Sequence, residues 1–146
     1  MVIRNALPSD ASAIYKLYKQ LVGEDAVSVT ANGIAALVTH RAQLLVCEIN
    51  QVVVGTVLIQ LCADVMYAEQ PFAVVENLVV DEGYRNQGVC AAMLAAVERI
   101  SLDADCSKIM LMSSVPRTEA HRAFLRAGYS GDAKRGFVRY RRQIVA

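Results

Sequence analysis

Two apolar runs rich in β-branched residues lie near the middle of the chain, 43-QLLVCEI-49 and 52-VVVGTVLIQL-61. Only Asn50 and Gln51 separate them, and a connection of two residues joins neighbouring strands that run antiparallel. A third run of the same kind, 72-FAVVENLVV-80, follows a segment over 62–71 that is typical of a loop. The three runs predict strands of one sheet, and the hairpin constrains the order in which that sheet is built.

Segments with helical periodicity flank these strands. Residues 8–22 begin with Pro, Ser and Asp, which are typical of a helix start, and then place apolar residues at helical spacing. A shorter helix is indicated around residues 34–38, and another is indicated over 117–128, where Gly128 ends it. A strand over 108–114 and a final pair of strands complete the order. This alternation predicts a mixed sheet with helices on its faces, an α/β (α+β) fold, in a single domain over residues 1–146.

Composition excludes several classes of protein. The chain has 146 residues, 55% of them hydrophobic, and a formal net charge of +1, so no electrostatic footprint for nucleic acid is expected. No apolar run approaches the roughly 18 residues that cross a bilayer, so no membrane partner is expected. The cysteines lack CxxC spacing, which argues against a metal site and disulfides and favours a reducing, cytoplasmic location; they are Cys47, Cys62, Cys90 and Cys106.

One basic cluster, 134-KRGFVRYRR-142, stands out near the C-terminus. Its charges alternate with Phe137, Val138 and Tyr140, as on a strand with one face in solvent. We therefore interpret it as the solvated side of a last strand, and a docking patch is the alternative.

The segment 84-YRNQGVCAAMLAAVERI-100 joins the third apolar run to an amphipathic helix. We expect the helix to begin near Asn86 or Gln87, with Asn86 as a favoured N-cap. The unpaired N–H groups of a first helical turn attract anions, Gly88 permits close approach, and Arg85 adds a positive charge. A plain capped helix, in which the glycine only eases packing, is the alternative. The turn is neither a P-loop nor a dinucleotide fingerprint, because the residues that define those motifs are absent.

The same turn resembles the acetyl-CoA signature RxxGxG/A of the GCN5-related N-acetyltransferase (GNAT) superfamily, which 85-RNQGVC-90 matches at Arg85 and Gly88. The preceding 76-ENLVVDEGYR-85 is similar to the family's fourth strand and its turn. Downstream, 117-RTEAHRAFLRAGY-129 resembles the AHxFYxxxGF/Y helix, and the start of the chain resembles the family's first strand and helix. The resemblance implies a small single-domain member with a mostly antiparallel sheet of about seven strands, splayed between the fourth and fifth, and about four helices.

The resemblance also implies a set of residues that bind acetyl-CoA, the co-substrate, without a metal. Backbone N–H groups of the turn would hold the pyrophosphate of coenzyme A, and the fourth strand would pair with its pantetheine arm. The amide of Leu78 or Val79 would polarise the thioester carbonyl, and the side chain of Arg117 could reach a phosphate. The residues implied are Leu78, Val79, Val80, Arg85, Asn86, Gln87, Gly88, Val89, Cys90, Arg117 and Phe124.

For catalysis, Glu76 is the candidate base that removes a proton from the acceptor amine. It would act through an ordered water molecule, or burial would raise the pKa of its carboxyl group. The alternative is that Glu76 is an ordinary strand residue that faces solvent or forms an ion pair. Phe124 stands where the family usually has a tyrosine that protonates the leaving thiolate, and Cys90 stands where it prefers Gly or Ala.

The implied activity is acetyl transfer to a primary amine of a small molecule, amino acid or peptide. A catalytically weak acetyl-CoA-binding regulator of a protein partner is the rival interpretation, and a homodimer is possible by analogy.

The resemblance further implies that the first helices and the loop before the fourth strand border the acceptor pocket. The sequence assigns no role to six polar and aromatic residues of these segments: Tyr15, Tyr18, Glu24, Asp64, Tyr67 and Glu69.

Overall fold

The computed structural model describes residues 1–23 and 25–144, so Glu24 lies outside the described residues. The chain forms two compact units, Met1–Leu111 and Met112–Ala146. The first unit contains the sheet and three α-helices, and the second contains one α-helix and the C-terminal segment.

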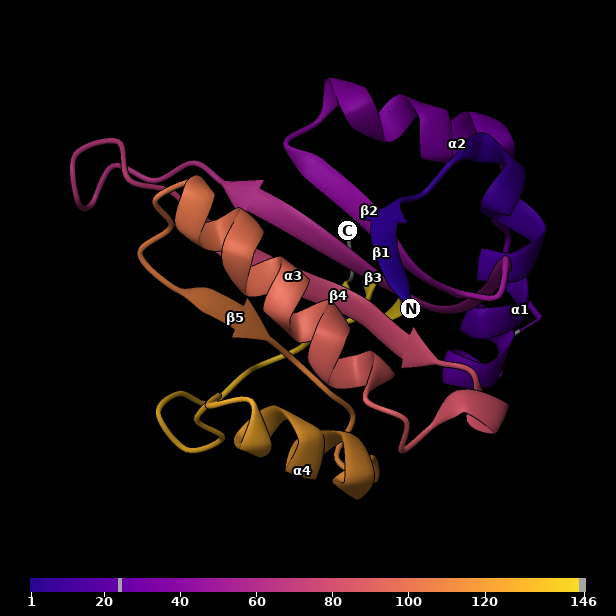
Figure 1. Ribbon diagram of the computed structural model, residues 1–146. Helices are drawn as coiled ribbons and strands as arrows, with labels where there is room; N and C mark the ends of the chain where they lie inside the picture. Colours follow the sequence, from indigo (N-terminus) through magenta and orange to yellow (C-terminus); the bar gives the residue numbers. More distant parts are fainter. Residues whose placement is uncertain (24, 145–146) are drawn as a thin grey trace. The chain divides into compact units, whose positions relative to one another are not determined.

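A five-stranded mixed sheet, in the order β1-β2-β3-β4-β5, forms the centre of the first unit (Figure 1). The first four strands pair antiparallel with their neighbours, whereas β4 and β5 pair parallel. The strands are β1 (Val2–Asn5), β2 (Ala42–Ile49), β3 (Val52–Cys62), β4 (Phe72–Val80) and β5 (Ile109–Leu111). The predicted mixed α/β architecture is confirmed.

The predicted hairpin between β2 and β3 is also present. Asn50 and Gln51 have φ angles of 51° and 66°, the left-handed values that a two-residue type I′ turn requires at both central positions. This turn matches the right-handed twist of the strands on either side and sets their register at Ile49 opposite Val52.

The helices of the first unit cover both faces of the sheet. On one face, Ile14 of α1 (Ala11–Val22) and Ile34 of α2 (Ala31–Ala36) pack in one cluster with Leu44 and Val46 of β2. On the other face, α3 (Val89–Asp103) lies so close to β3 that a Cβ atom at Gly55 would come within 2.9 Å of the Met93 sulfur. Single helical turns of 3-10 type occur at Pro8–Asp10, Leu37–Thr39 and Glu82–Tyr84. No α-helix of the described residues is long and apolar enough to cross a membrane.

The two neighbours of β4 cover different lengths of it. β5 pairs with β4 only over Ala73–Val75, whereas β3 pairs with it from Phe72 to Val80. Within the described residues, the register of β4 with β5 therefore ends at Val75, and its register with β3 continues to Val80. This second half of β4 leads directly into the turn before α3.

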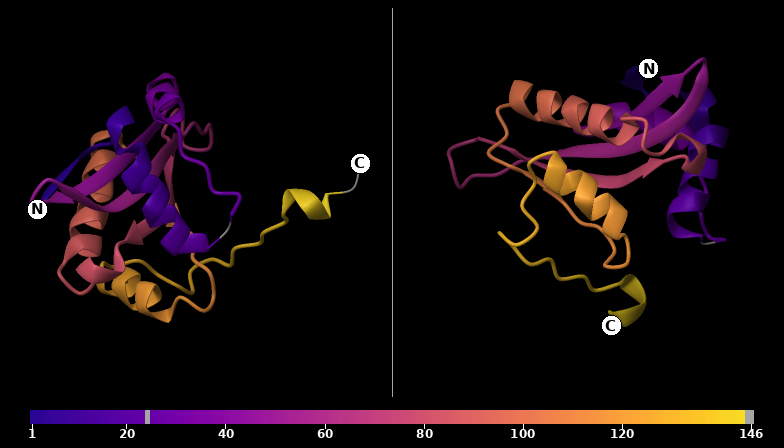
Figure 2. Two further views of the ribbon diagram at one scale, coloured as in Figure 1. Left: turned by 90° about the vertical axis from the view of Figure 1, so that its right-hand side faces the viewer. Right: turned by 60° about the horizontal axis from the view of Figure 1, so that its bottom comes forward.

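In the second unit, α4 (Thr118–Arg126) occupies most of the predicted helix 117–128. Gly128 ends it with φ 90°, and the Tyr129 N–H donates to the Phe124 carbonyl at 3.1 Å. This closure satisfies a carbonyl of the last helical turn. The segment after it runs as extended chain into a 3-10 turn at Arg141–Gln143 (Figure 2).

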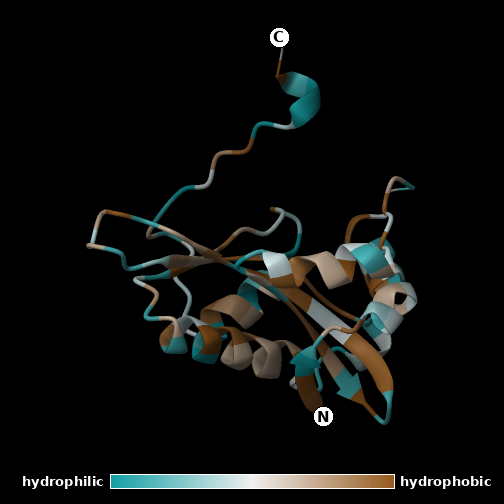
Figure 3. Cartoon of the chain, turned by 90° about the horizontal axis from the view of Figure 1, so that it is seen from above, coloured by the Kyte–Doolittle hydropathy of each residue, from teal (hydrophilic) through white to brown (hydrophobic). Residues whose placement is uncertain are grey.

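The prediction of about seven strands is wrong for the described residues, which form five. The expected strand over 108–114 spans only Ile109–Leu111, and the expected final pair of strands is absent from residues 129–144. That segment mixes hydrophobic and hydrophilic residues (Figure 3), and the alternation was inferred from its stretch 134–142. Two strands form stably only when one face packs on apolar surface, and here Phe137 is 87% exposed. Alternation alone therefore did not specify a strand pair.

Candidate functional site

The turn after β4 is held in place by the side chain of Asp81. One carboxylate oxygen accepts a hydrogen bond from the Gly83 N–H at 2.9 Å, and the other accepts one from the Gln20 amide of α1 at 2.9 Å. Gln20 in turn accepts from the Glu82 N–H at 3.1 Å, and the Asp81 N–H donates to Val54 of β3 at 2.8 Å. These bonds attach the turn to both a helix and the sheet, so its backbone is preorganised.

The helix that follows begins at Val89, later than the predicted start at Asn86 or Gln87. Gly88 is the N-cap residue, with φ 81°, and its carbonyl accepts the first helical hydrogen bond from the Ala92 N–H at 3.0 Å. Asn86 has φ 60° and lies in the turn instead of capping the helix. The prediction failed because two left-handed residues reverse the chain before the helix can start.

The last four residues of the turn, directly before α3, are exposed to solvent. Arg85, Asn86, Gln87 and Gly88 are exposed, and a Cβ atom at Gly88 would meet nothing within 4 Å. Among the described residues, no protein acceptor binds the N–H groups of Gln87, Gly88 or Val89. N–H groups at a helix start carry partial positive charge and bind anions such as phosphates. The backbone of this turn therefore fits a phosphate group.

Side chains next to the turn are consistent with an anion. The Arg85 Nε donates to the Val80 carbonyl at 3.4 Å, which keeps the guanidinium group near the end of β4. Within the described residues, no carboxylate forms an ion pair with Arg85. Cys90 follows Val89 in the first helical turn and is partly buried.

A β-bulge interrupts β4 just before this turn. Glu76 pairs with Leu58 and Val79 pairs with Thr56, so Asn77 and Leu78 together lie opposite Val57. At the bulge, Asn77 has φ 56°. The sequence analysis missed this bulge, although an asparagine inside an apolar run signals it, because asparagine is depleted in strands and tolerates the left-handed conformation.

The candidate base Glu76 lies at the edge of this bulge. It is partly buried, and its register partner Leu58 packs against the cluster that α1 and α2 cover. Because residues directly opposite each other in a ladder share a face, the Glu76 side chain is on the α1 and α2 side of the sheet.

Two predicted site residues belong to the second unit. Arg117 is the N-cap of α4 and is partly buried, and its N–H donates to the Ser114 carbonyl at 3.0 Å. Phe124 is the buried residue of that helix, 8% exposed. The first unit thus brings together Glu76, Leu78–Val80 and Arg85–Cys90, while Arg117 and Phe124 lie on α4.

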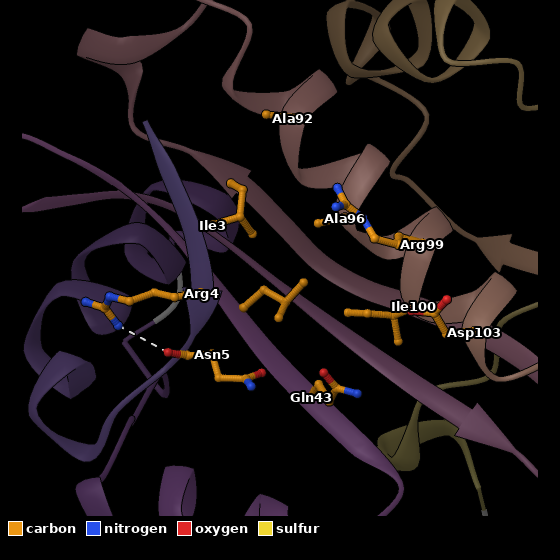
Figure 4. Close-up of a pocket in the computed structure, with 10 residues that line it drawn as sticks. Ile3, Arg4, Asn5, Gln43, Ala92, Ala96, Arg99, Ile100 and Asp103 are labelled. Atoms are coloured by element: carbon orange, nitrogen blue, oxygen red, sulfur yellow. Dashed lines mark hydrogen bonds between the residues drawn. The ribbon is translucent and has the colours of Figure 1, made fainter.

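A separate hollow of about 300 Å³ lies between β1, β2 and α3 (Figure 4). Ile3 and Asn5 of β1 line one side, and Arg99 and Asp103 from the C-terminal half of α3 line the other. None of the predicted site residues lines this hollow. Of the predicted site residues, Arg85–Gly88 lead into the N-terminal end of α3, and Val89 and Cys90 begin it.

Comparison with protein families supplies the decisive observation. The model of the acetyltransferase (GNAT) family matches residues 12–129, which include β4, the turn, α3 and α4. The chain belongs to the acetyltransferase (GNAT) family. The family prediction made from the Arg85–Cys90 turn and the α4 motif is confirmed, and the protein is an enzyme of the acetyltransferase class.

Solved structures agree with this acetyltransferase fold. An assumed acetyltransferase from Agrobacterium tumefaciens is 22% identical and matches with a TM-score of 0.86 over 96% of this chain and 100% of its own. Glucosamine-6-phosphate N-acetyltransferase from Arabidopsis thaliana is 19% identical, with a TM-score of 0.79 over 96% and 97% of the two chains. An aminoglycoside acetyltransferase from an uncultured soil metagenomic sample is 14% identical, with a TM-score of 0.81 over 95% and 94%. No curated protein sequence matches this acetyltransferase.

Proposed function

We propose that this acetyltransferase uses acetyl-CoA to acetylate a primary amine, within one domain over residues 1–146. The observation that carries the proposal is the exposed turn of residues 85–88, placed directly after the half of β4 that lies beyond its register with β5. The family match, which spans parts of both compact units, supports a single functional domain.

In this proposal the turn holds the pyrophosphate of coenzyme A. The N–H groups from Arg85 to Cys90 would donate to phosphate oxygens, and the Arg85 guanidinium would add a charge-assisted bond. The described residues contain no group of three or more His, Cys, Asp or Glu placed to hold a metal ion, and the proposal needs none.

The part of β4 beyond its register with β5 suits the pantetheine arm, whose amides can bond to a strand backbone as an added strand does. Leu78 and Val80 would supply these main-chain bonds. The amide of Leu78 or Val79 would donate to the thioester carbonyl oxygen, where negative charge develops during the reaction. An amide that is already fixed in this position stabilises the developing negative charge without having to reorient during the reaction.

The acceptor amine must lose a proton before or during attack. An alkyl amine with a pKa near 10 is almost fully protonated at pH 7, and freeing it costs roughly 4–5 kcal/mol. We assign Glu76 as the base, acting through water on the α1 and α2 side of the sheet. The C–N bond then forms as the C–S bond breaks, the amine proton passes toward Glu76, and the departing thiolate takes a proton from solvent.

Phe124 cannot donate that last proton, because it lacks the hydroxyl that the family usually has at this position. A thiol with a pKa near 8.5 is a tolerable leaving group, so turnover is expected to be slower without being abolished. Phe124 is also the observation that favours the rival function, an acetyl-CoA-binding regulator with little turnover.

The acceptor is proposed as a small molecule, amino acid or peptide with a primary amine. Support comes from two structural neighbours whose names specify amine-bearing small molecules, glucosamine-6-phosphate and aminoglycosides.

The test is release of free thiol from acetyl-CoA in the presence of amino sugars, aminoglycosides, polyamines, amino acids and short peptides. The proposal expects thiol release that depends on one class of amine, together with acetylated product by mass spectrometry. Tight binding of acetyl-CoA without transfer to any amine would favour the regulator instead.

A further inference from the structure

The turn after β4 is held by a side chain from α1, a helix on the other face of the sheet from α3. Gln20 lies near the end of α1 and is exposed. Its Nε2 donates to one carboxylate oxygen of Asp81 at 2.9 Å, and its Oε1 accepts from the Glu82 N–H at 3.1 Å. A single side chain of α1 therefore forms two hydrogen bonds with the connection that leads into α3, and the proposed function gives Gln20 no role.

The chemistry of the two partners fixes which way the Gln20 amide points. The Glu82 N–H can only donate, so it must meet the carbonyl oxygen of Gln20. The ionised Asp81 carboxylate can only accept, so it must meet the NH₂ group. If the amide were turned around, both bonds would be lost. Gln20 is therefore held in one orientation by two partners that are neighbours in the sequence.

The bonds continue from Asp81 into the rest of the turn. The second carboxylate oxygen of Asp81 accepts from the Gly83 N–H at 2.9 Å, and the Asp81 carbonyl accepts from the Tyr84 N–H at 2.9 Å. The carbonyl of Gly83 in turn accepts from the side-chain amide of Gln87 at 3.2 Å. Hydrogen bonds thus connect Gln20 on α1 with Gln87, a residue whose backbone N–H is assigned to the pyrophosphate.

The part of the turn that would bind phosphate is exposed and has unusual backbone angles. Residues 85–88 are exposed, and Asn86 and Gly88 have left-handed φ angles of 60° and 81°. An exposed segment has many alternative conformations, and ordering it on binding would lower the affinity for a ligand. A turn that is fixed before binding avoids this loss. Contacts that fix the turn therefore determine how tightly a phosphate group is held.

We propose that Gln20 is a positioning residue for acetyl-CoA: by bonding to Asp81 and Glu82 it holds the turn in the conformation whose N–H groups meet the pyrophosphate. The inference rests on the proposed function and deepens it, because it names a residue of α1 that sets the affinity for the cofactor through the turn. It is independent of the assignment of Glu76 as the base.

The central experiment exchanges the two polar partners. Gln20→Glu places a second carboxylate against that of Asp81, and Asp81→Asn leaves one side-chain oxygen for two donors, the Gln20 amide and the Gly83 N–H. Each single substitution breaks a bond, so each should weaken acetyl-CoA binding by about fivefold or more in calorimetry. In the double variant, the amide at position 81 donates to the carboxylate at position 20, and the affinity should return to within about twofold of wild type.

Charge alone predicts a different pattern of affinities. Because the pyrophosphate is an anion, the negative charge added by Gln20→Glu would weaken its binding, whereas the negative charge removed by Asp81→Asn would tighten it. Weaker binding by both single variants therefore supports positioning, and tighter binding by Asp81→Asn would overturn the inference. Gln70→Glu is the matched control, since Gln70 donates to Asp105 at 3.3 Å in an exposed contact. Its affinity for acetyl-CoA should stay within about twofold of wild type.

Kinetics separate positioning of the turn from a general loss of structure. If Gln20 acts through the turn, Gln20→Glu should raise KM for acetyl-CoA by about fivefold, while kcat at saturating acetyl-CoA changes less than about twofold. A general structural role predicts instead that kcat and Tm fall together with KM nearly unchanged, and that result would overturn the inference.

Backbone amide chemical shifts provide a readout that needs neither ligand nor activity. In ligand-free Gln20→Glu, the amides of Gly83, Gln87 and Gly88 should shift more than those of Ala73–Val75 on β4, and they should return toward wild type in the double variant. Unchanged shifts at Gln87 and Gly88 contradict the inference whatever the affinities, and changed shifts with an unchanged affinity contradict the link to acetyl-CoA. If the wild-type protein binds no acetyl-CoA, the proposed function fails, and the amide shifts alone decide whether Gln20 holds the turn.

Discussion

The guanidinium of Arg4 on β1 lies 2.7 Å from the carboxylate of Asp10, the last residue of the 3-10 turn before α1. A second bond at 3.1 Å makes the contact bidentate, and the Asp10 side chain is only 10% exposed. Asp10 also accepts from the Leu7 N–H at 2.7 Å. This one carboxylate therefore connects the first strand to the start of the first helix.

Asp10→Asn is expected to lower the free energy of unfolding by about 1–3 kcal/mol at pH 7, because the partly buried Arg4 loses its bidentate carboxylate and keeps only its pair with Glu48. The hydrogen bonds from Arg4 lower the pKa of Asp10 below its ordinary value of 3.8. The stabilisation is thus fully present above pH 3.8 and is lost as pH falls through the lower pKa of the folded state. Urea unfolding from pH 7 to pH 2 should show the two proteins converging in acid; a constant difference would contradict the account. Asp25→Asn removes an exposed pair with Lys19 and is the control, with no measurable change expected.

Gly55 limits how closely α3 packs on β3. A Cβ atom there would lie 3.2 Å from a Val89 methyl carbon and 3.3 Å from the Val79 carbonyl oxygen, in addition to the Met93 contact. Gly55→Ala should destabilise the protein by about 1–3 kcal/mol through overpacking, and it should weaken acetyl-CoA binding because Val89 follows the turn. Gly131→Ala, where the nearest atom is 3.9 Å away, is the control for thermal unfolding and binding. Equal effects of the two substitutions would refute the close-packing argument.

Glu76→Gln keeps the size and polarity of the side chain and removes its basicity. If Glu76 is the base, kcat should fall by about 10²–10⁴-fold at neutral pH, while the affinity for acetyl-CoA stays nearly unchanged. Steady-state kinetics with the preferred amine, and calorimetry with acetyl-CoA, measure the two quantities separately. Unchanged turnover would remove Glu76 from the mechanism.

Phe124→Tyr restores the hydroxyl that the family usually has on this helix. If protonation of the leaving thiolate limits turnover, kcat should rise, and the gain should be largest at a pH well below the tyrosine pKa of about 10. The pH profile of kcat measures this. No change at any pH would show that another step limits turnover, and that Phe124 is not the cause of a weak activity.

Much of the central fold could be predicted from local sequence. The strands over 43–49, 52–61 and 72–80 were predicted to within one residue at either end, because β-branched runs bounded by loops have few alternatives. The first helix was predicted from its Pro-Ser-Asp start and its apolar spacing. The family was recognised because the Arg85–Gly88 motif stands between a strand and a helix, as phosphate binding requires.

What could not be predicted depends on contacts between distant residues. The bulge at Asn77 depends on how β4 pairs with β3, where the register shifts between Thr56 and Leu58. The late start of α3 depends on the left-handed Gly88, and the absence of the last strand pair depends on whether residues 129–144 find an apolar surface. A local residue such as Asn77 or Gly88 can signal a bulge or a left-handed turn, but the pairing and packing that complete these features involve distant parts of the chain.

The most direct test of the central claim is calorimetric titration of acetyl-CoA into the wild-type protein, Gly88→Ala and Gly23→Ala. Both glycines have positive φ angles, 81° and 64°, and open space around the missing Cβ, so alanine strains the backbone at each without a steric clash. Because Gly23 ends α1 and Gly88 lies in the proposed phosphate-binding turn, only Gly88→Ala should lose affinity, by about tenfold or more. Equal affinity of all three proteins, or no binding to any of them, would contradict the assignment of residues 85–90 as the acetyl-CoA site.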